Sequence, residues 1–113
     1  MNKIAHICTS GIMHKLLVDK LTLQQKEGYK IDLISSKEGY NKELMSQYDI
    51  NLRFVYMNRT INIYDDIKSI LKLYKLLKEE NYDIVHTHNA KAGIIGRIAA
   101  KMAGIPVIIH TTH

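Results

Sequence analysis

The chain has 113 residues, of which 46% are hydrophobic and 24% charged, and its formal net charge is +5 at pH 7. These values are typical of one globular domain with a single core and exclude a disordered tail. The one cysteine, Cys8, excludes a disulfide framework and indicates a reducing compartment. No run approaches the ~18 apolar residues of a membrane span. The first residues lack the apolar core of a signal peptide, so we expect a cytoplasmic protein.

The positive net charge bears on the partners of the chain. It favours attraction to anionic groups, such as phosphates or an anionic membrane surface. The lysines are scattered among acidic residues, without the interleaved aromatic residues that bind single-stranded nucleic acid. We therefore expect no nucleic-acid partner, and we keep peripheral contact with an anionic membrane as an open alternative.

The first part of the chain alternates between strands and helices. Residues 3–8 predict a buried strand, and apolar residues at helical spacing predict a helix over 13–27. Gly28 is placed to end that helix in a left-handed cap. A second strand is expected over 30–35, followed by a loop over 36–39.

A short helix and a long one come next. We expect a helix over 41–48, a third strand over 51–56 and, after a polar connection, a long helix over 63–80. One apolar stripe should bury the long helix, with its lysines facing solvent. The stripe consists of Ile67, Ile70, Leu71, Tyr74 and Leu77, and the lysines are Lys68, Lys72 and Lys75.

The last third repeats the alternation. Residues 83–86 predict a fourth strand and 90–103 a helix, which Gly104 ends with Pro106 just beyond it. A fifth strand is expected over 107–110. Small residues form one smooth face of the last helix, which predicts close packing against the sheet because glycine is otherwise unfavourable inside a helix. They are Ala92, Gly93, Gly96, Ala99 and Ala100.

This alternation indicates βαβ units and hence a parallel sheet, and right-handed crossovers favour the strand order 3-2-1-4-5. The predicted fold is a Rossmann-like, three-layer α/β/α domain over residues 1–113, with helices on both faces of a five-stranded parallel sheet. In such sheets, ligands bind outside the carboxyl ends of the strands where the strand order reverses. That point lies between the first and fourth strands.

Two histidine clusters follow the fourth and fifth strands: His86 with His88, and His110 with His113. His86 and His88 are two residues apart in a strand, so both point to the same side, and the second cluster could approach them from the adjacent strand. The imidazoles could contact a substrate or act as general acid or base, satisfy backbone groups at the strand ends, or bind zinc. We expect no metal ion, because no carboxylate or cysteine joins the clusters.

The loop after the first strand is a second candidate. Ser10 can cap the next helix, and Gly11 lets a ligand approach the backbone at a helix N-terminus, where N–H groups favour anions. The alternative is a tight turn without a ligand, since the loop has neither a G-x-G-x-x-G fingerprint nor a Walker lysine. Arg59, after the third strand, could meet a phosphate or carboxylate or remain in water. Lys91 and Arg97 are expected to be solvated, with Lys91 nearer the crevice.

These segments resemble the amino-terminal domain of family-four glycosyltransferases of the GT-B fold, above all bacterial enzymes of capsular or exopolysaccharide assembly. The resemblance rests on YDIVHTHNAKAGIIGRIAA (82–100) and GIPVIIHTTH (104–113), with the loop after the first strand and EGY at 27–29. It covers nearly the whole chain. It implies a retaining transferase that moves a sugar from a nucleotide-sugar to a lipid-linked or saccharide acceptor in surface polysaccharide synthesis.

In this resemblance the amino-terminal domain mainly holds the acceptor. Gly11 matches a glycine-rich loop near the donor phosphates, with one glycine where the family commonly has two. Asn89 matches a position that faces the acceptor, and His113 matches the histidine beside the transferred sugar, so it is the expected catalytic residue. The nucleotide-sugar is a substrate, so no cofactor is expected. The further expected substrate contacts are Ser10, Arg59, His88 and His110.

The family's second Rossmann-like domain carries a basic pair at the donor phosphates and a Glu-x7-Glu motif, and neither occurs in this sequence. The resemblance therefore implies an amino-terminal domain that meets the donor through a carboxy-terminal domain, is inactive alone, and works at the inner face of the plasma membrane. Two alternatives stay open. One is a non-catalytic binding or scaffold subunit acting with a separate catalytic chain, and the other is a small flavodoxin-like nucleotide-binding domain.

Overall fold

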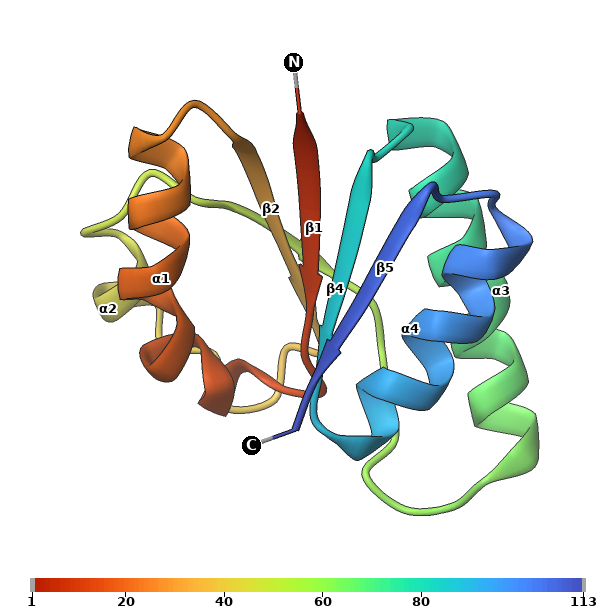
Figure 1. Ribbon diagram of the computed structural model, residues 1–113. Coiled ribbons are helices and arrows are strands. Elements are labelled where there is room, and N and C mark those ends of the chain that lie inside the picture. Colours follow the sequence, from red (N-terminus) through yellow and green to blue (C-terminus); the bar gives the residue numbers. More distant parts are fainter. Residues whose placement is uncertain (1, 113) are drawn as a thin grey trace.

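The computed structural model describes residues 2–112, whose parallel strands form one sheet between two layers of helices (Figure 1). The strands are β1 (Lys3–Ile7), β2 (Lys30–Ser35), β3 (Asn51–Phe54), β4 (Ile84–His88) and β5 (Val107–Thr111). The helices are the 3-10 turn η1 (Gly11–Met13), α1 (His14–Lys26), α2 (Lys42–Met45), α3 (Ile63–Glu80) and α4 (Ala90–Met102).

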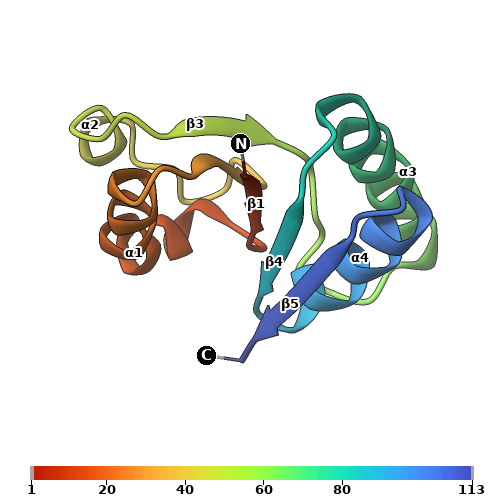
Figure 2. The same ribbon diagram turned by 45° about the horizontal axis from the view of Figure 1, so that its top comes forward.

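The strand order confirms the predicted topology. Within the described residues the sheet has five strands in the order β3-β2-β1-β4-β5, and all neighbouring strands are parallel. Helices α1 and α2 lie on one side of the sheet and α3 and α4 on the other (Figure 1, and the tilted view in Figure 2). This is the expected three-layer Rossmann-like arrangement, and its strand order reverses between β1 and β4.

Differences from the predicted boundaries follow the pairing of the strands. β4 continues to His88, two residues beyond the predicted end, because His88 pairs with Thr111 of β5. β3 ends at Phe54, two residues early, where its pairing with Ser35 of β2 stops. Gly28 follows α1 with a φ of 100°, which confirms the predicted left-handed cap.

The small residues of α4 let this helix lie close to the sheet, as predicted, and the whole smooth face is buried. A Cβ atom at Gly96 would lie 2.6 Å from Cγ2 of Thr87 on β4. One at Gly93 would lie 2.5 Å from the ring of His110 on β5. The two glycines therefore have a packing role, and they hold the start of α4 beside the carboxyl end of β4.

The buried stripe of α3 differs from the predicted one. Leu73 is fully buried and Ser69 is 2% exposed, whereas Ile67 and Leu71 are 49% and 53% exposed. The helix is rotated relative to the prediction because the Ser69 hydroxyl faces inward, where it donates to the carbonyl of Tyr56 at 2.5 Å. The spacing of apolar residues does not predict a hydrogen bond from a buried serine. The lysines of α3 are exposed, as expected.

The turned helix presents apolar residues beside those lysines. Ile63 and Tyr64, in its first turn, are 70% and 82% exposed. No helix within residues 2–112 is both long and apolar enough to cross a membrane.

Candidate functional site

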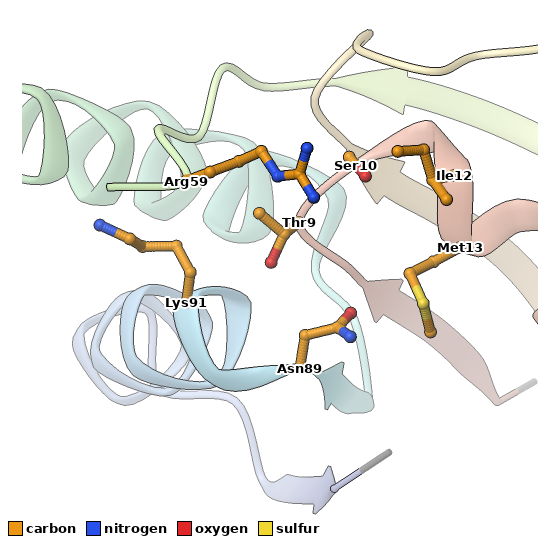
Figure 3. Close-up of a pocket in the computed structure, with 7 residues that line it drawn as sticks. All are labelled: Thr9, Ser10, Ile12, Met13, Arg59, Asn89 and Lys91. Atoms are coloured by element: carbon orange, nitrogen blue, oxygen red, sulfur yellow. The ribbon is translucent and has the colours of Figure 1, made fainter. Parts of the chain in front are cut away.

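A cavity of about 250 Å³ lies at the carboxyl ends of β1 and β4, where the strand order reverses (Figure 3). This is the position at which sheets of this kind bind ligands. Three segments that are distant in the sequence supply its walls: the loop after β1, the loop after β3, and the start of α4. The lining residues are Thr9, Ser10, Ile12, Met13, Arg59, Asn89 and Lys91.

The loop after β1 is joined to α4 by a hydrogen bond, because the backbone N–H of Ala92 donates to the Thr9 hydroxyl at 3.3 Å. Ser10 lies at the N-cap position but makes no side-chain capping bond, so the predicted cap is wrong. The reason is the tight 3-10 turn that begins the helix, in which Met13 N–H donates to the Ser10 carbonyl at 3.2 Å. Ser10 nevertheless contributes to the cavity wall.

Gly11 lies beside the cavity wall but packs against protein. A Cβ atom there would lie 2.5 Å from the backbone nitrogen of Tyr40, and the Gly11 N–H donates to the carbonyl of Glu38 at 2.7 Å. The close approach that requires glycine is therefore an approach of the loop after β2. Contact between Gly11 and a ligand stays a prediction.

Asn89 has an unusual backbone conformation where β4 joins α4. Its φ of 74° and ψ of 164° fall in a region that is essentially restricted to glycine, and strain of this kind clusters at ligand sites. The side chain lines the cavity, and its amide extends toward the side of Met13 (Figure 3). Within residues 2–112, the Asn89 Oδ1 atom is buried and has no hydrogen-bond partner. Buried acceptors normally have a hydrogen-bond partner, and contact between Asn89 and an acceptor substrate stays a prediction.

Two cations flank the cavity, and each is held by a carboxylate. Arg59 contacts Glu38 at 2.9 Å, and both side chains are more than half exposed. Lys91 contacts Asp66 at 2.8 Å, with its side chain only 15% exposed, and it also donates to the carbonyl of Thr60 at 2.7 Å. The expectation that Lys91 is solvated is therefore wrong, because the loop after β3 folds over it.

The first histidine pair lies on the other side of β4 from α4, among buried groups. His86 and His88 do share one face, as predicted, and His6 of β1 joins them because it pairs with His86 in register. The Nδ1 atom of His6 lies 3.0 Å from Nε2 of His88, and the His6 Nε2 atom lies 2.7 Å from Oε1 of Gln24 on α1. His88 is fully buried and does not line the cavity of Figure 3. Its expected contact with substrate stays a prediction.

Sequence reasoning missed His6. The signal was present, since the predicted strand order sets position 6 beside position 86. Burial lowers the pKa of His6 to about 4, against the opposing effect of its hydrogen bond to Gln24, while the charges of His86 and Lys20 lower it further. Burial likewise raises the pKa of the Cys8 thiol to about 12, so this cysteine is inert near neutral pH.

His110 does not meet the first histidine pair as expected. His110 pairs in register with Thr87, so its ring lies on the α4 side of the sheet and its Nδ1 atom is 2.8 Å from the Thr87 hydroxyl. The pleat sends alternate residues to opposite faces, which separates His110 from His86 and His88. His113, the expected catalytic residue, lies outside the described residues.

Comparisons with known proteins assign the family. The sequence model of the family described as "Glycosyl transferase 4-like" matches residues 4–113. The chain belongs to this family. The glycosyl transferase 4-like chain is 41% identical, over 98% of its length, to the Escherichia coli "UDP-Gal:alpha-D-GlcNAc-diphosphoundecaprenol alpha-1,3-galactosyltransferase", of which it covers 30%. It is 34% identical, over 96% of its length, to the Staphylococcus aureus "Capsular polysaccharide biosynthesis glycosyltransferase CapM", of which it covers 28%.

The fold agrees with this assignment. A solved glycosyltransferase from Rickettsia africae superimposes on this chain with a TM-score of 0.75 and 17% sequence identity. The superposition covers 98% of this chain and 29% of the Rickettsia africae protein. At this identity the likeness concerns the fold alone. The expected membership in a GT-B glycosyltransferase family is confirmed, and the chain spans about 30% of the length of the curated relatives named above.

Proposed function

We propose that this chain is the acceptor-binding half of a glycosyltransferase that moves a sugar from a nucleotide-sugar to a lipid-linked or saccharide acceptor in surface polysaccharide synthesis. The observation that carries the proposal is the cavity of Figure 3, which lies at the strand-order reversal of a glycosyl transferase 4-like chain. The name of the Escherichia coli relative includes a diphosphate-linked lipid acceptor. The same class of acceptor suits the cations found here.

Arg59 is the cation best placed to change partners. Its ion pair with Glu38 is exposed, and exposed pairs of this kind contribute about 0–1 kcal/mol, so a phosphate can replace the carboxylate at little cost. Lys91 is more buried and stays with Asp66, adding positive charge near the start of α4. Helix N-termini also favour anions. Asn89 Oδ1 then accepts a hydrogen bond from a sugar hydroxyl or acetamido group of the acceptor.

Binding measurements with a short-chain GlcNAc-diphosphate lipid test this arrangement. We expect Arg59→Gln to weaken binding roughly tenfold, because a hydrogen bond to a charged group contributes about 1.5–3 kcal/mol. Arg97→Gln is the matched control, since Arg97 is exposed on α4 and does not line the cavity. Equal affinities of the two variants, or equal affinity of the wild type for a glycoside without phosphates, would contradict the proposal.

We also propose that the sugar-transfer cavity uses no resident metal ion, with Arg59 meeting the phosphate charge instead. Acceptor binding should then be unchanged when Mg²⁺ is added. A tenfold gain in affinity with Mg²⁺ would contradict this part of the proposal.

The location that we propose is the cytoplasm, at the inner face of the plasma membrane. The exposed apolar residues Ile63, Tyr64 and Ile67 on α3 lie beside Lys68 and other lysines, a combination that suits the surface of an anionic bilayer. Co-sedimentation with anionic vesicles, and its loss with neutral vesicles, is the expected result. Ile63→Ser combined with Ile67→Ser should reduce it.

A further inference from the structure

The buried histidines His6, His86 and His88 form a cluster that the cavity of Figure 3 does not use. They lie on the face of the sheet that α1 covers. One ring nitrogen from each lies within 4.8 Å of the others. The rings are also in contact, with centroids 4.3 Å apart for His86 and His88 and 5.0 Å apart for His6 and His86.

These separations approach those of a tetrahedral metal site, and the stacked rings of His86 and His88 would turn to direct both lone pairs at one ion. Two nitrogens bound to one zinc ion at about 2.0–2.1 Å lie roughly 3.3 Å apart. The Nδ1 atom of His6 and the Nε2 atom of His88 are 3.0 Å apart, so a small outward movement suffices for that pair. All three side chains are less than 10% exposed.

The second ring nitrogens have partners of the kind that orient metal ligands. His6 Nε2 lies 2.7 Å from the amide oxygen of Gln24, and an N–H there leaves Nδ1 as the nitrogen with a lone pair. His86 Nε2 lies 2.6 Å from the hydroxyl of Thr111 on β5. Hydrogen bonds at the second nitrogen fix the tautomer and the ring orientation of metal-ligating histidines.

A second cavity reaches the cluster at His86. It has a volume of about 250 Å³ and is lined by Gln24 of α1, by Glu27 just after that helix, by His86, and by Ile109 of β5 among others. This cavity has room for the water molecule that would complete four-coordination. The carboxylate of Glu27 at its wall would offset part of the charge of a divalent cation.

We infer that His6, His86 and His88 bind one Zn²⁺ ion, or a similar divalent transition metal, with a water molecule from this cavity as the fourth ligand. Imidazole is a preferred ligand of such metals. In the metal-bound state His88 adopts the neutral tautomer whose Nε2 carries the lone pair, and no proton is lost. The ion links β1 to β4, and its role is structural. The inference does not rest on the proposed sugar transfer.

The expectation of no metal rested on the lack of a carboxylate or cysteine in the two histidine clusters, His86 with His88 and His110 with His113. The register of the sheet removes His110 from that set and supplies His6 instead. His6 brings an orienting partner from α1, which the sequence pattern did not show.

Zinc titration of the chain, made without a polyhistidine tag, tests the site. We expect one Zn²⁺ per chain by calorimetry, a higher unfolding temperature with Zn²⁺, and a tetrahedral Co²⁺ absorption spectrum. His6→Asn and His86→Asn should each weaken Zn²⁺ binding more than about tenfold, and Gln24→Leu about tenfold. His110→Asn, on the opposite face, is the matched control and should leave affinity unchanged.

Folding of each variant is checked by circular dichroism. If His6→Asn does not fold, Gln24→Leu and the Co²⁺ spectrum of the wild type decide, because both leave all three histidines in place. Absence of saturable binding to the wild type would overturn the inference. So would an octahedral Co²⁺ spectrum, or binding that survives both His6→Asn and His86→Asn.

Discussion

At the scale of single residues, Asn89 combines two features that lower the stability of the fold. Asn89 adopts backbone angles suited to glycine, and its Oδ1 atom is buried without a partner within residues 2–112. Both features raise the free energy of the folded chain at one position on the cavity wall, which agrees with the proposed binding role of Asn89. The strain can be measured directly.

Replacing Asn89 by glycine should stabilise the fold by about 1 kcal/mol. Relief of backbone strain contributes about 1–3 kcal/mol, and the greater flexibility of glycine in the unfolded chain costs about 0.5–1 kcal/mol. Urea unfolding measures the difference. The matched control is Asn81→Gly at the end of α3, where φ and ψ of 56° and 54° are angles that asparagine tolerates. A gain at Asn81 as large as that at Asn89 would show that no special strain exists at Asn89.

A second residue-scale prediction concerns pH. His14 is 1% exposed, its Nε2 atom lies 2.8 Å from the Ser35 hydroxyl, and burial lowers the pKa of His14 below the ordinary value of 6.5. The unfolded chain therefore binds more protons than the folded chain below about pH 6.5. The free energy of unfolding falls as the pH drops through that value.

Urea unfolding at pH 7.5 and pH 5.5 checks this effect of His14. The loss of stability between the two pH values should be smaller in His14→Asn than in the wild type. An equal loss in both proteins would show that His14 does not contribute. Glu80, whose pKa is lowered by its bonds to Lys3 and Arg53, loses its contribution only below about pH 4.5 and does not confuse the comparison.

At the scale of elements, the contact of α4 with β4 positions the binding cavity. Gly96 lets the helix lie against Thr87, and the same approach brings Ala92 N–H within 3.3 Å of the Thr9 hydroxyl. The register of β4 then sends Thr87 toward α4 and its neighbours His86 and His88 toward α1. One strand thus supports both the cavity and the histidine cluster.

Gly96→Ala should destabilise the chain although alanine favours helices by about 1 kcal/mol over glycine. The added methyl group would meet Cγ2 of Thr87, and overpacking of this kind costs about 1–3 kcal/mol. Thr87→Ser removes that methyl group and keeps the hydroxyl that contacts His110. In a double-mutant cycle, the combined variant should be at least about 0.5 kcal/mol more stable than the sum of the single changes. Additive effects on the free energy of unfolding would mean that contact with the Thr87 methyl group is not what destabilises Gly96→Ala.

At the scale of the whole molecule, the chain covers 30% and 28% of the two curated relatives, both glycosyltransferases. The resemblance assigns the groups that bind the donor phosphates to a second domain. The groups on the described residues are suited to holding an acceptor, with cations beside Asn89 at one crevice wall. Binding and transfer should therefore be separable.

We predict that the 113-residue chain binds the diphosphate-linked acceptor but transfers no sugar to it. Incubation with a panel of nucleotide-sugars, followed by chromatography of the lipid, measures transfer. Acceptor binding by the same preparation shows that the protein is folded and competent. Turnover by the chain alone would refute the division of labour, and tight binding of a flavin or nicotinamide nucleotide would favour the flavodoxin-like alternative.

Much of this architecture is present in local sequence patterns. The alternation of strand and helix predicts the parallel sheet and its order, because crossovers between parallel strands have one hand. The small residues of α4 predict its tight packing, and Gly28 predicts the end of α1. The histidines and Asn89 are placed at strand ends by the same patterns. These features depend on residues near one another in the chain, so the sequence alone reveals them.

Other features depend on contacts between distant segments, and the sequence does not show them. The inward hydroxyl of Ser69 rotates α3, and the loop after β3 covers Lys91. The register of three strands joins His6 to His86 and turns His110 away. A register shift of one residue would move every side chain of a strand to the other face. Sequence patterns therefore place the histidines near the carboxyl ends of the strands. The pairing of the strands decides which of them lie on the same face of the sheet and contact one another.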